Sequence, residues 1–173
     1  MKNIFIIVFI TIWLFSCLKE DIYLKNYLSD KGISLTITGK AGEYQLDETY
    51  RMMLYDSYMF QSYVDTLQNQ LAYYFRIIRY SEDYQSNVIF EIGLDRNLNP
   101  VLGSCEYHLT TIKDHNKIVN ITNGSDMPEL LVANLSYNPG TGNLKFNYNF
   151  DVDNGSDQNY SIKGSADVKA YQY

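Results

Sequence analysis

The stretch Leu144-Lys145-Phe146-Asn147-Tyr148-Asn149-Phe150 alternates strictly between large apolar and polar side chains. Successive side chains of a β-strand point to opposite faces of a sheet, so this pattern predicts a strand with one buried and one solvent-facing side. The turn sequence Asn138-Pro139-Gly140-Thr141-Gly142 precedes it, and a polar segment at 151–158 follows it. These features together predict an antiparallel hairpin on each side of the strand.

Much of the remaining chain repeats this arrangement of short strands and polar turns. Further strands are expected at 33–38, 88–94, 101–112, 118–122, 130–137 and 160–172. The chain contains seventeen tyrosines, a residue that packs well on a pleated surface. The spacing predicts a mainly antiparallel β fold, either a sandwich or a bent meander.

One region favours a helix instead. Five apolar residues recur at helical spacing, and they are Phe60, Val64, Leu67, Leu71 and Phe75. Such spacing predicts an amphipathic helix over about 49–70, with Asp47 or Thr49 as its cap. The aromatic and β-branched segment 73–80 favours a strand, so 49–80 is either one long helix or a helix followed by a strand. The expected fold class is therefore α+β, mainly antiparallel β with one helix.

Residues 1–16 have the composition of a targeting signal. Lys2 is the only charged residue among them, and an apolar run extends from Ile4 to Phe15 with Thr11 as its one polar interruption. As a helix this run would be roughly 18 Å long at 1.5 Å per residue, shorter than the ~30 Å hydrocarbon core of a bilayer. The pattern favours a signal segment at 1–16 over a permanent membrane span.

The four residues Leu14-Phe15-Ser16-Cys17 resemble the lipobox of bacterial lipoproteins. The resemblance implies cleavage before Cys17, a diacylglycerol group on its sulfur and an acylated N-terminus. Two or more acyl chains give stable membrane anchoring. Phe15 is bulkier than the usual residue at its position, and the alternative is an ordinary secretory signal followed by a chance cysteine.

The next residues, Leu18-Lys19-Glu20-Asp21, resemble the surface-export signal of lipoproteins in one Gram-negative phylum. The resemblance implies an outer-membrane, lipid-anchored protein that faces the outside of the cell. The alternative is a solvated tether whose orientation, periplasmic or outward, stays open. We expect a lipidated N-terminus and tether over 17–32 and a single β-rich domain over 33–173.

Two segments near the end of the chain carry a second resemblance. They are 133–144, which contains the Asn138–Gly142 turn, and 162–168, which closes the last strand. The pair is similar to the C-terminal hairpin of small, uncharacterised β-rich lipoproteins from the same phylum. Those families have no settled activity, so the resemblance implies no catalytic residue.

Composition and motifs argue against several classes of function. The formal net charge is −6, which gives no basic surface for nucleic acid. The chain has only two histidines, too few for a multi-histidine zinc site, and no nucleophile or nucleotide-binding motif is present. Cys105 and His108 are three apart on an expected strand, so they should lie on opposite faces. With Cys17 lipidated, Cys105 has no disulfide partner, and we expect it to be buried.

The weak metal candidates are Asp151, Asp153 and Asp157, which surround Gly155 in a polar loop. Calcium needs several oxygen ligands on a tight turn, but the EF-hand pattern fails where Ile162 replaces its last glutamate. The alternative is a hairpin loop that uses Asp, Asn and Gly for turn geometry. We therefore expect neither a metal nor a cofactor.

Tyr171 and Tyr173 share one face of the last expected strand and are weak binding candidates. Exposed tyrosines can stack on sugars or form protein interfaces, although tyrosines of a small β-protein also complete its core. The sequence predicts a non-enzymatic, membrane-anchored module that binds an extracellular protein or glycan, or serves as an envelope component. The alternative function is a small glycan-processing or hydrolytic accessory protein.

Overall fold

The computed structural model describes residues 30–54, 58–62, 71–113, 117–122, 130–153, 155 and 157–170. In these ranges the chain forms ten β-strands and no helix. The strands are β1 (Gly32–Ala41), β2 (Tyr44–Met52), β3 (Tyr58–Ser62), β4 (Tyr73–Tyr80), β5 (Asn87–Leu94), β6 (Pro100–Lys113), β7 (Lys117–Thr122), β8 (Leu131–Asn138), β9 (Asn143–Asp153) and β10 (Gln158–Lys169).

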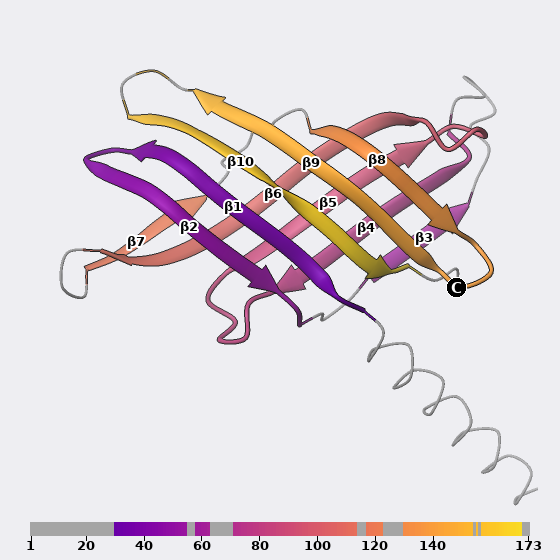
Figure 1. Ribbon diagram of the computed structural model, residues 1–173, viewed down its shortest axis with the longest axis horizontal. Coiled ribbons are helices and arrows are strands. Elements are labelled where there is room, and N and C mark those ends of the chain that lie inside the picture. Colours follow the sequence, from indigo (N-terminus) through magenta and orange to yellow (C-terminus); the bar gives the residue numbers. More distant parts are fainter. Residues whose placement is uncertain are drawn as a thin grey trace, which may run out of the picture. The chain divides into compact units, whose positions relative to one another are not determined.

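The strands form two antiparallel sheets of five strands each. Sheet A has the order β2-β1-β10-β9-β8, and sheet B has the order β3-β4-β5-β6-β7. The two sheets lie one over the other, and their strands cross at a steep angle (Figure 1). Sheet B is a simple meander, whereas sheet A joins the β1–β2 hairpin to the β8–β9–β10 meander. The predicted mainly antiparallel β fold is confirmed.

The pairing of β1 with β10 joins the two ends of the described chain in sheet A. The register runs from Gly32 opposite Asp167 to Ala41 opposite Gln158. Ile33, Leu35 and Ile37 of β1 all face the core, as do the apolar residues of β10. A one-residue slip would move the apolar side chains of a strand to the solvent, so the alternation fixes this register.

The helix predicted over about 49–70 is wrong wherever the structure describes that region. Residues 49–52 belong to β2 and residues 58–62 form β3, while 55–57 and 63–70 lie outside the described residues. Phe60 and Phe75, two members of the apparent helical face, are partners across the β3–β4 ladder. The first and last residues of the apparent helical face therefore lie on two different strands. Pairing with strands distant in the chain decides whether such a segment forms a helix or a strand, because strand propensity depends strongly on context.

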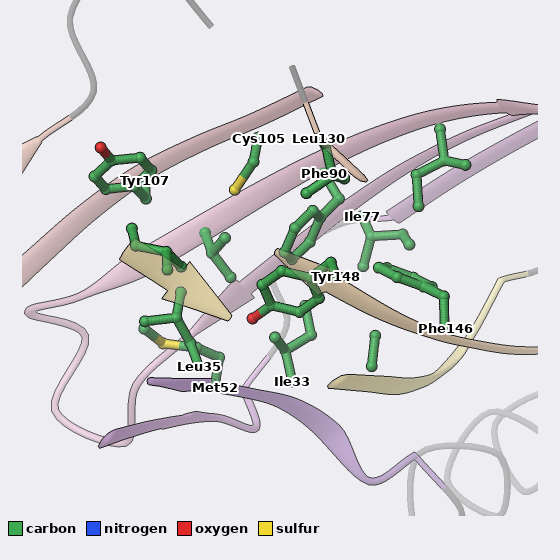
Figure 2. Close-up of a cluster of buried hydrophobic side chains, with 14 of the residues drawn as sticks. Ile33, Leu35, Met52, Ile77, Phe90, Cys105, Tyr107, Leu130, Phe146 and Tyr148 are labelled. Carbon is green, nitrogen blue, oxygen red and sulfur yellow. The ribbon is translucent and has the colours of Figure 1, made fainter. Parts of the chain in front are cut away.

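The core lies between the sheets and is rich in aromatic rings (Figure 2). Phe90 of β5 packs against Phe146 and Tyr148 of β9, with ring centroids 5.5 and 4.6 Å apart. The one-sided strand predicted from the alternation at 144–150 is confirmed, because Leu144, Phe146, Tyr148 and Phe150 are buried while the residues between them are exposed. Cys105 is also buried, as expected. The edge-to-face contact of Phe90 with Phe146 adds to the stabilisation from burial.

Four polar side chains are accommodated inside this core. The hydroxyls of Tyr107 and Tyr160 are 2.6 Å apart, and the Tyr148 hydroxyl donates to the Ser34 carbonyl at 3.0 Å. Arg79 of β4 is fully buried, and its Nη1 donates to the Ile78 carbonyl at 2.9 Å. Such bonds offset the cost of removing polar groups from water.

Candidate functional site

The outer face of sheet A is mostly polar, and several of its side chains pair with one another. The pairs are Thr36 with Thr49 at 3.1 Å, Ser161 with Asp151, and Lys145 with Asp167 at 3.0 Å. On β9 the outward positions 145, 147 and 149 are lysine and asparagine residues, all exposed. A surface whose polar groups are paired or hydrated gains little from binding a partner. The outer face of sheet A is therefore expected to stay in contact with solvent.

The outer face of sheet B has a different composition. Its outward side chains form rows across the hydrogen-bonded strands. The rows are Tyr80-Asn87-His108-Thr122, Ile78-Ile89-Glu106, Arg76-Glu91-Ser104 and Tyr74-Gly93-Leu102. We call these side chains, with Ile112 and Ile118, the sheet B face. Tyrosine, isoleucine and arginine on one surface are typical of a contact face rather than a solvated one.

Exposed apolar side chains are concentrated on sheet B. Six large hydrophobic residues of the described chain are exposed, namely Tyr84, Val101, Leu102, Ile112, Ile118 and Leu131. Five of them belong to sheet B or its turns, and the sixth begins the edge strand β8. Ile112 and Ile118 are partners across β6 and β7, with exposed fractions of 66% and 62%. Adjacent exposed isoleucines lose hydration water readily when a partner covers them.

Leu71 extends the apolar part of the sheet B face. A Cβ added at Gly93 would lie 2.6 Å from Leu71 Cδ2 and 3.1 Å from Leu102 Cβ. Gly93 therefore lets these two leucines approach the outer side of the strand. Within the next row, Arg76 Nε lies 3.3 Å from Glu91 Oε1, so the charges of this pair offset each other.

The turn between β4 and β5 presents an exposed aromatic ring at the end of this face. Tyr84 has a φ of 57°, a left-handed conformation that side chains larger than glycine or asparagine rarely adopt. Its side chain is 63% exposed, and its ring centroid lies 5.7 Å from that of Tyr80. We call Tyr80 and Tyr84 the tyrosine platform.

Hydrogen bonds within this turn hold it in one shape. Asp83 Oδ1 accepts from the Ser81 hydroxyl at 2.5 Å and from the Gln85 backbone N–H at 3.0 Å. These two bonds lower the pKa of Asp83, the Ser81 hydroxyl having the larger effect. The Thr110 hydroxyl of β6 lies 2.9 Å from the Gln85 carbonyl, which it can reach as a donor. Hydrogen bonds inside the turn, together with the contact from Thr110 of β6, therefore fix the position of the tyrosine platform.

His108 and its neighbours add polar groups beside the platform. His108 Nε2 lies 3.5 Å from Thr110 Oγ1, and Thr110 Oγ1 lies 3.0 Å from Asn120 Oδ1. As expected, His108 and Cys105 are on opposite faces, His108 outward and Cys105 in the core. This separation excludes a direct Cys–His pair.

The structure describes only some of the residues proposed from the sequence. Cys17, Tyr171 and Tyr173 lie outside the described residues. At the end of β9, Asp151 accepts from the Ser161 hydroxyl of β10 and Asp153 accepts from the Gly155 N–H at 3.1 Å. Among the described side chains, no group of three or more His, Cys, Asp or Glu is placed to hold a metal ion.

No protein-family model matches this sequence, and no curated protein or solved structure is significantly similar to it. Nor does the described part of the chain contain a helix that is long and apolar enough to cross a membrane.

Sequence reasoning did not identify the tyrosine platform or its polar neighbours. Residues 81–84 were noticeable only as a polar turn with two adjacent acids. One signal was available, because a tyrosine inside a turn that returns the chain between two strands is unusual where glycine and asparagine are preferred. The residues of the 80-87-108-122 row are far apart in the chain, and only the sheet register brings them together.

Proposed function

We propose that the chain is a lipid-anchored outer-membrane lipoprotein whose β-domain is a non-catalytic binding module facing the cell exterior. The anchor is supported by the apolar run ending at Leu14-Phe15-Ser16-Cys17. A lipid on Cys17 followed by a short tether would leave the sandwich free to meet extracellular partners. Its contact surface in this proposal is the sheet B face.

The observation that carries this assignment is the difference between the two outer faces. Five of the six large exposed hydrophobic residues in the described chain lie on sheet B or its turns. Burying exposed apolar area is the main source of binding free energy, whereas hydrated polar pairs contribute little. The sheet B face therefore has more to gain from a partner than the sheet A face.

The anchor is tested by metabolic labelling with a radioactive fatty acid. We expect label in the wild-type chain and none in Cys17→Ala, because the cysteine sulfur is the proposed lipidation site. Cys105→Ala is the matched control and should keep its label, since its thiol is buried. Equal label in wild type and Cys17→Ala would refute the lipoprotein assignment.

The contact face is tested by site-specific photo-crosslinking in cells that produce the full chain. The photoreactive residue p-benzoylphenylalanine, which inserts into C–H bonds of proteins and glycans alike, replaces Ile118 in one variant and Asn149 in another. Both positions are exposed, but Ile118 lies on the sheet B face and Asn149 on the outer face of sheet A. We expect higher-mass adducts only from position 118. Adducts of equal yield from both positions, or from 149 alone, would contradict the assignment.

A further inference from the structure

We infer that the tyrosine platform binds the ring of a neutral sugar, with Asn87 and His108 as the side chains that hydrogen-bond its hydroxyls. The inference rests on the proposed binding role of the sheet B face and adds the ligand class. It concerns the end of that face where Tyr80, Asn87 and His108 form one row.

The conformation of Tyr84 is the first argument. A φ of 57° is costly for a residue with a Cβ, and an aromatic side chain, unlike that of asparagine, cannot hydrogen-bond its own backbone in return. The ring is not used in the core, because it is 63% exposed. Strained backbone that supports an exposed side chain is typical of binding sites, where contact with a ligand recovers the cost.

Rigidity is the second argument. The carboxylate of Asp83 bonds both Ser81 and Gln85, the Ser81 N–H donates to the Ser86 carbonyl at 2.9 Å, and Thr110 braces the turn from β6. A ligand that stacks on Tyr84 therefore does not have to order the turn first. Preorganisation of this kind lowers the entropic cost of binding.

The chemistry of the neighbouring side chains is the third argument. A sugar ring presents C–H groups on one face and hydroxyls around its rim. The C–H face can stack on the exposed ring of Tyr84, and the ring of Tyr80, tilted by 44° with its centroid 5.7 Å away, lies beside it. Asn87 offers an amide donor and acceptor, and His108 offers ring nitrogens, so both can bond a hydroxyl rim. Both side chains are partly exposed on the same outer face.

Charge and polarity narrow the ligand class. Glu82 and Asp83 lie in the same turn, both exposed, and they disfavour anionic sugars near the platform. The centre of a protein interface is a desolvated cluster of apolar and aromatic anchors. The row beside the platform instead continues with the amide of Asn87, the imidazole of His108 and the hydroxyl of Thr122. These groups can form hydrogen bonds with a hydroxyl-rich ligand.

The test is affinity electrophoresis of the full chain through gels that contain a neutral polysaccharide. Glucan, mannan, galactan and xylan are the probes, and a polyoxyethylene detergent avoids competition from sugar headgroups. We expect at least one neutral polymer to retard the wild-type chain. Tyr84→Gly should weaken this binding about tenfold or more, as expected when a stacking ring is removed. The thermal midpoint of Tyr84→Gly should stay unchanged or rise, because glycine accepts the left-handed conformation.

Two control variants separate ring stacking from strain and folding. Tyr84→Phe keeps the ring and should keep the retardation. Asn134→Gly relieves another left-handed residue, at φ 53° in β8, and should leave binding unchanged. Binding that survives in Tyr84→Gly, or is lost in Tyr84→Phe, would overturn the stacking role.

The polymer panel tests the ligand class separately from the contact face. No retardation by any neutral polymer, or retardation by acidic polysaccharides alone, would overturn the inference. If position 118 gives photo-crosslinked adducts but no polysaccharide binds, the proposed contact face is supported and only the sugar ligand is refuted. Peptides of a second protein, found in these adducts by mass spectrometry, would then identify a protein partner.

Discussion

The Tyr107 hydroxyl of β6 lies 2.6 Å from the Tyr160 hydroxyl of β10, so a buried hydrogen bond joins the two sheets through their core. The two rings meet edge to face with centroids 6.5 Å apart. Each hydroxyl is the polar partner of the other, and both residues belong to the hydrophobic core. The bond makes the pairing of the sheets specific, because either hydroxyl alone in this place would be buried without its partner.

A double-mutant cycle measures this bond. Tyr160→Phe should lower the free energy of unfolding by about 1–3 kcal/mol, because it leaves the Tyr107 hydroxyl buried and unsatisfied. The double variant Tyr107→Phe/Tyr160→Phe should cost less than the sum of the single variants, since it removes both polar groups together. Urea unfolding followed by circular dichroism provides the free energies. Additive losses would show that the hydroxyls are not coupled.

Buried tyrosines predict a loss of stability at alkaline pH. Burial raises the pKa of Tyr50 to about 12, an effect that the Thr111 hydroxyl partly offsets, and burial also raises the pKa of Tyr107, Tyr148 and Tyr160. Above about pH 10 the unfolded chain releases these phenolic protons while the folded chain keeps them. The unfolded state then binds fewer protons, so stability should fall as pH rises through the window from about 10 to 12.

The alkaline effect is measured by urea unfolding between pH 8 and pH 12, together with phenolate absorbance of the folded protein. The tyrosines should leave the free energy of unfolding unchanged up to about pH 10 and lower it above that pH. Phenolate absorbance should rise in two phases, with the buried tyrosines ionising as the protein unfolds. A single phase near the ordinary tyrosine pKa with no loss of structure would contradict the burial of these hydroxyls.

Gly164 allows the Tyr148 hydroxyl to reach across β10 to the Ser34 carbonyl of β1. A Cβ at Gly164 would lie 2.7 Å from the Tyr148 hydroxyl oxygen and would also collide with the Ser34 carbonyl, the acceptor of that hydroxyl. Gly164→Ala should therefore lower the free energy of unfolding by about 1–3 kcal/mol through overpacking. Tyr148→Phe should cost only about 1 kcal/mol, the value of one hydrogen bond. Chemical unfolding compares the two, and a Gly164→Ala variant as stable as wild type would refute the close approach.

The loop between β9 and β10 should not respond to calcium. Asp151 and Asp153, at the end of β9, already accept hydrogen bonds from Ser161 of β10 and from Gly155, so these oxygens stabilise the β9–β10 hairpin itself. We expect no shift of the thermal midpoint at millimolar calcium. An ion present at a hundred times its dissociation constant would add about 2.7 kcal/mol, which moves the midpoint by several degrees. Such a shift, abolished by Asp153→Asn, would establish a metal site.

The sequence alone determined the local elements whose pattern is strictly periodic. The alternation at 144–150 predicted β9, and its turns predicted β8 and β10, because side chains two apart share a face of any strand. Opposite faces for Cys105 and His108 followed from the same rule. The lipobox resemblance at Leu14–Cys17 is likewise local, and it stays a prediction.

Tertiary structure decided which segments pair and what their outer faces carry. The pattern from Phe60 to Phe75 satisfied a helical period, but a strand ladder across β3 and β4 made these two residues partners. The same kind of pairing placed Tyr80, Asn87 and His108 in one row and left Tyr84 exposed in its turn. Which strands become neighbours depends on the burial of apolar surface between residues distant in the chain. A local repeat in the sequence does not contain that information.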